Sequence, residues 1–260
     1  MRRARLGVAI VLAAAPVLAA LSPARAEVIQ RGDLRIGFAG KLTPHVLPRS
    51  GTAPVKISLD GRIGTTDGTA PPQLRRITLD INRHGRLDSA GLPVCHLGQI
   101  QPATNQRALE ACRAAKVGEG SFSAEVLLPT QAPFPQAGKV LAFNGVYRGR
   151  PAILAHVFGT EPIATSYTLP FTVTRRPGTF GIQLSALLPD VAPKWGYVTG
   201  LSMVLGRTFR SHGRVHAYLS AGCPAPAGFP GATYSLARAS FDFEAQTLST
   251  TVTRSCGARG

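Results

Sequence analysis

The stretch Val55–Asp60, VKISLD, alternates apolar and polar residues, and this period of two decides the class of fold. Residues 77–82 (ITLDIN) repeat the alternation, and residues 240–246 (SFDFEAQ) place Phe241 and Phe243 on one face and two acids on the other. Successive side chains of a β-strand point to opposite faces, so such a segment turns one face to a core and one to water. All three segments are predicted to be half-buried strands.

Turn-forming residues divide the rest of the chain into short pieces of the same kind. The 260 residues include 28 glycines and 21 prolines, with β-like runs between them. About a dozen short strands separated by turn signals are typical of antiparallel sheets packed face to face. We expect an all-β fold, an antiparallel β-sandwich of the immunoglobulin-like or jelly-roll-like kind, with one short α-helix.

The helix is predicted near residues 104–116. Thr104 can cap its first turn, and Gly118 stands where a helix commonly ends. One face of this helix is apolar and is expected to pack on the body of the protein; it carries Ala108, Leu109, Cys112 and Ala115.

The first residues predict export. Three arginines precede an apolar run at 6–21, and Ala24 and Ala26 occupy the small-residue positions of a cleavage site. We expect residues 1–26 to be a signal peptide cleaved near Ala26, and residues 27–260 to form a single secreted β-sandwich domain. The proline-rich segment 127–139 could instead separate two small β domains. No later apolar run reaches the roughly 20 residues of a spanning helix, so no transmembrane segment is expected after cleavage.

The four cysteines are predicted to form two disulfides, because an exported protein with an even number of cysteines commonly pairs them. Three pairings are possible. We favour Cys95–Cys112, which closes a short loop across the helix, and Cys223–Cys256, which ties the last strand to the preceding hairpin. The sequence lacks the short ligand pairs of a zinc site, so neither a metal nor a cofactor is expected.

Short motifs around these cysteines carry a resemblance. They are GLPVC (91–95), CRAAKVGEG (112–120), FNG (143–145), YLSAGCP (218–224) and RSCG (254–257). Together they resemble a group of uncharacterised exported proteins of high-GC Gram-positive bacteria. The resemblance implies a secreted β-fold with cysteines at these positions, and it implies no catalytic residue and no ligand.

The charge favours anionic partners. Lysine and arginine number 29 against 13 acids, and loss of the four arginines in the signal peptide would lower the net charge of +16 to about +12. Anionic cell-envelope polymers or glycans are the expected partners, with no specific binding of nucleic acid. A GC-rich genome offers another explanation, because only five of the cations are lysines.

Two acids are the candidates for catalysis. Asp242 and Glu244 share one face of a predicted strand, and paired carboxylates are the machinery of glycoside hydrolysis. Ordinary strand alternation with both acids in water explains the same pattern.

Two groups of residues are candidates for binding. Arg207, Arg210 and Arg214 lie in or next to a predicted hairpin at 209–218, whose basic tip could contact phosphate or carboxylate groups. Trp195 and Tyr197 could form a stacking platform for a sugar, or anchor a loop on the core.

The remaining motifs are weak. Residues 80–88 match part of a calcium-loop spacing, but Gly91 replaces the bidentate acid, and a polar hairpin turn is the better interpretation. No nucleophile elbow, zinc-protease motif or phosphate-binding loop is present. The favoured function is a non-catalytic, envelope-associated or extracellular binding or structural module with affinity for anionic surfaces. The alternative is an extracellular polysaccharide-acting hydrolase using Asp242 and Glu244.

Overall fold

The structure, a computed structural model, describes residues 26–128, 130–160, 164–188 and 196–260. Trp195 and residues 1–25 of the predicted signal peptide lie outside the described residues. The described part of the chain forms eighteen strands, two α-helices and one 3-10 helix, which confirms the all-β prediction. The strands outnumber the expected dozen because several are very short, such as β4 (Ala53–Pro54) and β3 (Val46–Pro48).

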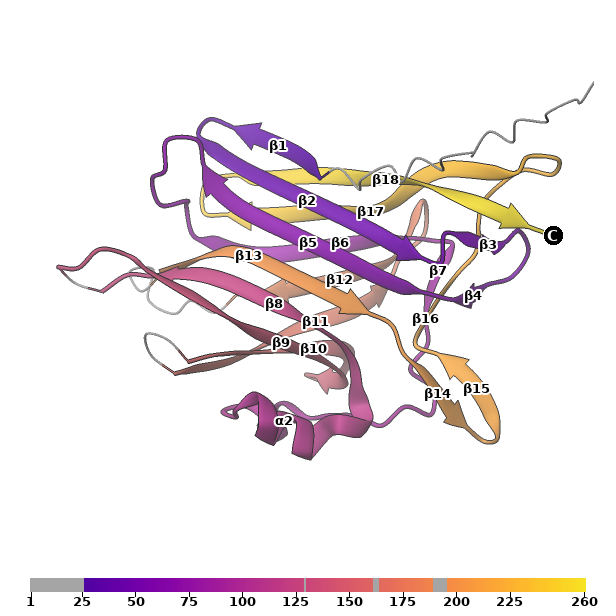
Figure 1. Cartoon of the computed structure of the whole chain (residues 1–260), viewed down its shortest axis with the longest axis horizontal. Helices are drawn as coiled ribbons and strands as arrows, with labels where there is room; N and C mark the ends of the chain where they lie inside the picture. The colour runs from indigo at the N-terminus through magenta and orange to yellow at the C-terminus, as the bar shows by residue number, and fades with distance from the viewer. Residues whose placement is uncertain (1–25, 129, 161–163, 189–195) are drawn as a thin grey trace, which may run out of the picture.

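Thirteen of these strands form one sheet, which curls so that its two halves face each other like the layers of a sandwich (Figure 1). Neighbouring strands are antiparallel except for the pair formed by β18 and β3. In order across the sheet, the strands are β1 (Glu27–Arg31), β2 (Leu34–Thr43), β5 (Lys56–Thr65), β13 (Gly196–Leu205), β8 (Lys116–Val126), β9 (Phe134–Tyr147), β10 (Arg150–Gly159), β11 (Thr165–Arg175), β12 (Phe180–Leu187), β6 (Leu74–Asn82), β17 (Gly231–Phe243), β18 (Thr247–Arg259) and β3.

The main core lies between the two halves of this sheet. The alternation predicted for residues 55–60 is present, since Ile57 and Leu59 on β5 are buried and face inward. Across the core, the rings of Phe38 and Phe241 meet edge to face, with their centroids 6.4 Å apart. The period of two therefore builds both layers of the core.

Two small sheets lie at the border of the large one. One is a two-stranded ribbon of β14 (Thr208–Ser211) and β15 (Arg214–Ala217), and the other joins β4, β16 (Leu219–Ala221) and β7 (Gly85–Leu87). The turn of the ribbon has positive φ angles at His212 (49°) and Gly213 (74°), which suit a two-residue hairpin turn. The hairpin predicted from the sequence is therefore present.

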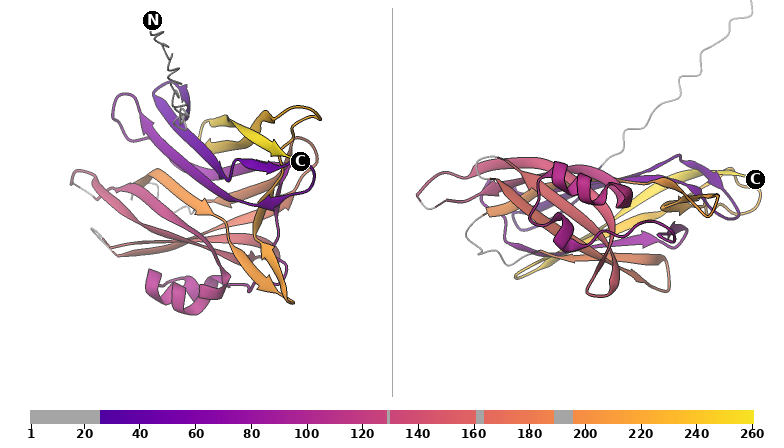
Figure 2. Two further views of the ribbon diagram at one scale, coloured as in Figure 1. Left: turned by 45° about the vertical axis from the view of Figure 1, so that its right-hand side comes forward. Right: turned by 90° about the horizontal axis from the view of Figure 1, so that it is seen from below.

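A helical segment covers part of the outer face of the large sheet. It comprises α1 (Leu97–Ile100), α2 (Asn105–Cys112) and η1 (Arg113–Ala115), and it packs against β9 and β10 (Figure 2). The hydroxyl of Thr104 accepts a hydrogen bond from the Arg107 amide at 3.2 Å, as expected for the cap. The single turn of α1 has too few residues to give a helical period in the sequence.

Both disulfides of the favoured pairing are present. Cys95–Cys112 and Cys223–Cys256 have Cα–Cα distances of 5.6 Å and 5.8 Å. Two disulfides indicate a protein that works outside the cytoplasm. None of the helices in the described ranges has the length and apolarity required to cross a bilayer.

The proline-rich segment after residue 126 connects two paired strands. Val126 on β8 is opposite Phe134 on β9, so the segment joins neighbours within one sheet.

Candidate functional site

The two acids proposed for catalysis lie on the solvent side of the sheet and bind different arginines. Asp242 on β17 is 3.9 Å from Arg76 and accepts a hydrogen bond from the Thr247 hydroxyl at 2.9 Å. Glu244, just beyond the end of the strand, forms an ion pair with Arg75. Neither acid lines the two cavities found between the halves of the sheet. Each carboxylate is thus occupied by an arginine, and neither faces a described cavity that could hold a substrate.

The proposed sugar platform is described only in part, because Trp195 lies outside the described residues. Tyr197 lies at the start of β13, opposite Glu125 on β8, and is half-buried. Partial burial raises the pKa of the Tyr197 hydroxyl, and the charge of Glu125 raises it further. The hydroxyl of Tyr197 therefore stays protonated and uncharged at neutral pH.

The three hairpin arginines have different environments. Arg210 is opposite Val215, and Arg214 is opposite Ser211, so the two arginines extend from opposite faces of the β14–β15 ribbon. Both are exposed. At the base of the ribbon, Phe209 is buried and its ring stacks on that of His216, with centroids 5.5 Å apart. The ribbon is therefore anchored at its base and carries its charge at its tip.

Arg207 joins the ribbon to the helical segment. Its guanidinium donates hydrogen bonds to the carbonyl oxygens of Ala114, at 2.6 Å, and Lys116, at 2.8 Å. These bonds place the exposed Arg113 next to the base of the ribbon. We call Arg113, Arg207, Arg210 and Arg214 the basic corner. Within the described part of the chain, no carboxylate forms an ion pair with any of the four.

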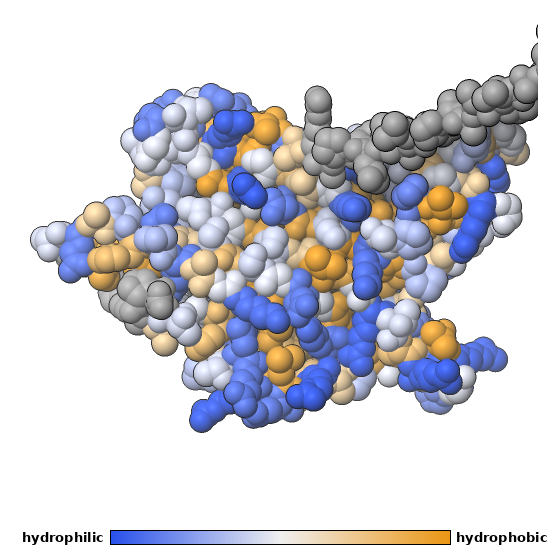
Figure 3. Space-filling model, viewed as in Figure 1, coloured by the Kyte–Doolittle hydropathy of each residue, from blue (hydrophilic) through white to orange (hydrophobic). Residues whose placement is uncertain are grey.

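The surface around this corner is largely hydrophilic, apart from the exposed Val215 on β15. On the face shown in Figure 3, hydrophilic side chains gather over the lower part, around α2 and the β14–β15 ribbon. The nearby Lys116 is different from the corner arginines, because it lies 2.8 Å from Glu119. The hydrogen bond from Lys116, followed by the one from Lys139, lowers the pKa of the Glu119 carboxyl. Glu119 thus forms ion pairs with two lysines and does not neutralise the arginines of the basic corner.

The corner depends on contacts between segments far apart in the sequence. The disulfide to Cys95 holds the end of α2, and the chain just before Cys95 passes beside the ribbon. Gly91 has a φ of +77°, and a Cβ atom there would lie 2.1 Å from the Ser211 hydroxyl oxygen. Only glycine permits both this backbone conformation and this close approach.

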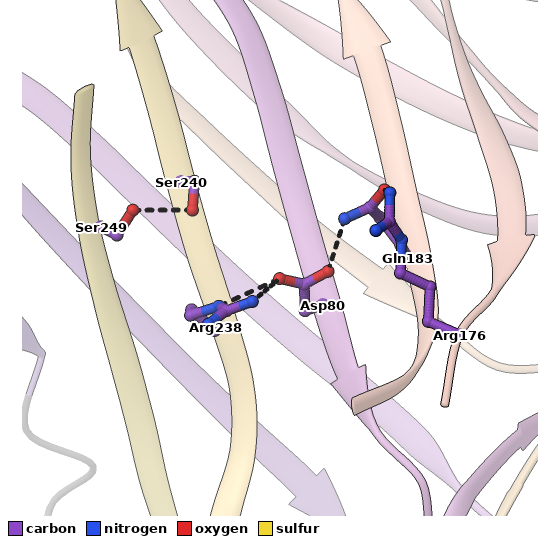
Figure 4. Close-up of polar contacts among 6 residues, drawn as sticks. All are labelled: Asp80, Arg176, Gln183, Arg238, Ser240 and Ser249. Carbon is purple, nitrogen blue, oxygen red and sulfur yellow. Dashed lines mark hydrogen bonds and ion pairs between the residues drawn. The ribbon is translucent and has the colours of Figure 1, made fainter. Parts of the chain in front are cut away.

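A second polar cluster lies on the outer face of β12, β6 and β17 (Figure 4). It was not predicted from the sequence. Asp80 is only 4% exposed, and one of its oxygens accepts hydrogen bonds from Arg238 Nε and Nη2, at 3.0 and 2.7 Å. Its other oxygen accepts a bond from Gln183 at 2.9 Å, and Gln183 in turn accepts one from Arg176 at 2.7 Å. Since both carboxylate oxygens are satisfied, the cluster joins three strands and leaves no free acid.

The partial calcium-loop motif is a tight turn between β6 and β7, which belong to different sheets, so the expected hairpin is not formed there. Asp80, its first predicted ligand, is committed to Arg238 and Gln183. Asn82, its second, accepts a hydrogen bond from the His84 amide at 3.0 Å and donates one to the Ser235 carbonyl at 2.7 Å. Among the residues described, no group of three or more His, Cys, Asp or Glu side chains could hold a metal ion.

No protein family, curated protein or solved structure matches this chain.

Proposed function

We propose that this protein is an exported, non-catalytic module that binds anionic polymers of the cell envelope through the basic corner. The observation that carries the proposal is a projecting ribbon whose exposed arginines have no acidic partners in the described part of the chain. The net positive charge of the chain supports it, since a positive field draws anions toward the surface. The two disulfides and the predicted signal peptide support export.

The shape of the ribbon favours a polymer over a small anion. Arg210 and Arg214 extend from opposite faces, so one small anion would not contact both easily. A flexible chain that crosses the tip can contact one arginine on each face. Arg207 and Arg113 would then extend the contact toward the helical segment.

The alternative of a polysaccharide hydrolase finds less support in the geometry. A glycosidase needs one carboxyl as acid and another as base or nucleophile across the scissile bond. Here Asp242 and Glu244 are each bound to an arginine on the solvent side. The resemblance to exported proteins with the same cysteine motifs adds support for export and none for catalysis.

The proposal predicts binding to dextran sulfate, and none to uncharged dextran. Replacing Arg210 and Arg214 by serine is expected to lower affinity at low salt about tenfold, because two exposed charge contacts are lost. Affinity should also fall as salt is added, since exposed charges are screened. Fluorescence titration with a labelled polymer measures both effects.

The matched control replaces Arg31 and Arg35 by serine. These exposed arginines lie on β1 and β2, away from the ribbon, and the variant has the same net charge (Figure 1). Its affinity should change less than about twofold. An equal loss in both variants would show that only the overall charge matters. Release of sugars from envelope glycans that disappears in D242N/E244Q would favour the hydrolase instead.

A further inference from the structure

The interior of the curled sheet contains a cavity that the basic corner does not use. It has a volume of about 60 Å³ and lies between the two halves of the sheet. All of its lining residues are apolar or glycine, and the larger ones include Phe38, Leu59, Phe171, Met203 and Phe241. An apolar cavity of this kind excludes water and accepts apolar molecules, because no wall group can replace a lost hydrogen bond.

The cavity is partly open to solvent. Its deep walls, such as Ile153 and Leu184, are buried, whereas Leu79 on β6 and Val198 and Leu201 on β13 are only half-buried. These three apolar residues therefore mark the opening.

A β-bulge at the opening keeps the cavity wall apolar. The register between β13 and β8 shifts between Val198 and Gly200, so Thr199 has no partner opposite it. The Thr199 hydroxyl donates a hydrogen bond to the Ser123 hydroxyl at 2.9 Å, and Val198 lines the cavity. Bulges of this kind redirect side chains, and they are frequent beside binding sites.

A glycine in the wall of the cavity leaves room for an occupant. Gly61 on β5 lines the cavity, and a Cβ atom there would have its nearest neighbours at 3.8 Å. A Cβ atom would therefore fit there without a clash, and a side chain at this position would point into the space that glycine leaves open. A core strand gains stability from such packing, so this glycine is a departure from the usual composition of a strand interior.

We propose that this cavity binds one end of an unbranched alkyl chain, which enters between Leu79 and Val198. The wholly apolar wall selects an aliphatic ligand. The small volume selects a narrow one, because a cavity that holds a benzene ring is larger, about 150 Å³. The site is separate from the basic corner and independent of the function proposed for it.

The test measures decanol binding to the intact protein by calorimetry. Decanol is uncharged, so the arginines do not contribute to its affinity. Saturable binding is expected for the natural chain, and Gly61→Leu should weaken it at least about tenfold by filling the cavity. Gly61→Ala fills less space and should give an intermediate loss.

The matched control is Gly64→Leu on the same strand. Gly64 lies toward solvent, and a Cβ atom there would meet nothing within 4 Å. This variant should bind decanol as the natural chain does, and thermal unfolding checks that all variants are folded. Absence of saturable binding to the natural chain, or equal binding by Gly61→Leu and Gly64→Leu, would overturn the proposal. Dextran sulfate binding should be the same in all of these variants.

Discussion

At the scale of single residues, His156 is a buried histidine whose protonation state links stability to pH. It lies on β10 with no exposed surface, beneath the connection between α1 and α2, and its Nδ1 atom is 3.5 Å from the Thr168 hydroxyl. Burial lowers the pKa of His156 below its usual 6.5, and a hydrogen bond with the Ala103 backbone acts in the opposite direction. The folded protein therefore holds this ring neutral.

Stability is expected to fall as the pH drops below 6.5. In that range the unfolded chain takes up a proton at His156 while the folded chain does not, so protonation favours unfolding. His156→Gln should show a smaller loss of unfolding free energy between about pH 7.5 and about pH 5.5. Urea titration at both pH values measures this. His84, whose pKa is also lowered, mainly by burial, contributes equally to both proteins. Identical pH dependence in the two would contradict the prediction.

The face of the strand on which Asp80 lies could be predicted from the sequence, but its burial could not. The alternation of residues 77–82 correctly placed Asp80 on the face opposite Ile77 and Ile81. It also implied that this acid faces water. In the structure Asp80 is buried, because Arg238 and Gln183 arrive from two other strands. The burial of Asp80 depends on side chains from strands that are far away in the sequence. The local pattern of residues around Asp80 does not predict these neighbours.

At the scale of elements, the helical segment is held mainly by one disulfide and one small apolar cluster. Cys95, Ile100, Ala108 and Cys112 pack there against Leu141 and other residues of β9 and β10. The bond Cys95–Cys112 spans 17 residues, and Cys223–Cys256 spans 33. Cross-links limit the conformations of the unfolded chain, so both should stabilise the fold.

Replacing Cys95 and Cys112 together by serine is expected to lower the free energy of unfolding by about 3 kcal/mol, and replacing Cys223 and Cys256 by about 4 kcal/mol. The longer loop gives the larger entropic effect. Urea unfolding of both variants measures the difference. If the first variant is as stable as the natural chain, the disulfide does not hold the helical segment.

At the scale of the whole molecule, an arginine bridges strands near opposite ends of the curled sheet. Arg254 on β18 donates a hydrogen bond from Nε to the carbonyl of Gly40 on β2 at 2.8 Å. Its Nη1 atom is 3.3 Å from a carboxylate oxygen of Glu27 on β1. These contacts hold the two halves of the sheet together at the edge where no strand pairing among the described residues joins them.

Arg254→Ala is expected to lower the free energy of unfolding by about 1–3 kcal/mol, because it leaves partly buried acceptors without their charged donor. Hydrogen exchange should rise most in β1 and β2, which lose their link to β18. The exposed Arg35→Ala on β2 is the control and should change neither quantity by more than about 0.5 kcal/mol. Faster exchange spread evenly over the chain would contradict a local bridge.

The local features of this protein follow from residues that are neighbours in the chain. The period of two predicted the strands at 55–60 and 77–82, Thr104 predicted the start of α2, and the spacing of the cysteines favoured the observed disulfides. These features depend on side-chain alternation, capping and short connections, which neighbouring residues specify.

The contacts between distant segments could not be predicted from the chain and became visible in the folded protein. Long-range contacts brought Arg207 to the helical segment, placed Arg210 and Arg214 on opposite faces of the ribbon, and bound Asp242 and Glu244 each to an arginine. They also enclosed the apolar cavity, which residues of eight strands line. The physical reason is that contacts between distant strands depend on sheet order and curvature, which the local pattern of side chains does not encode.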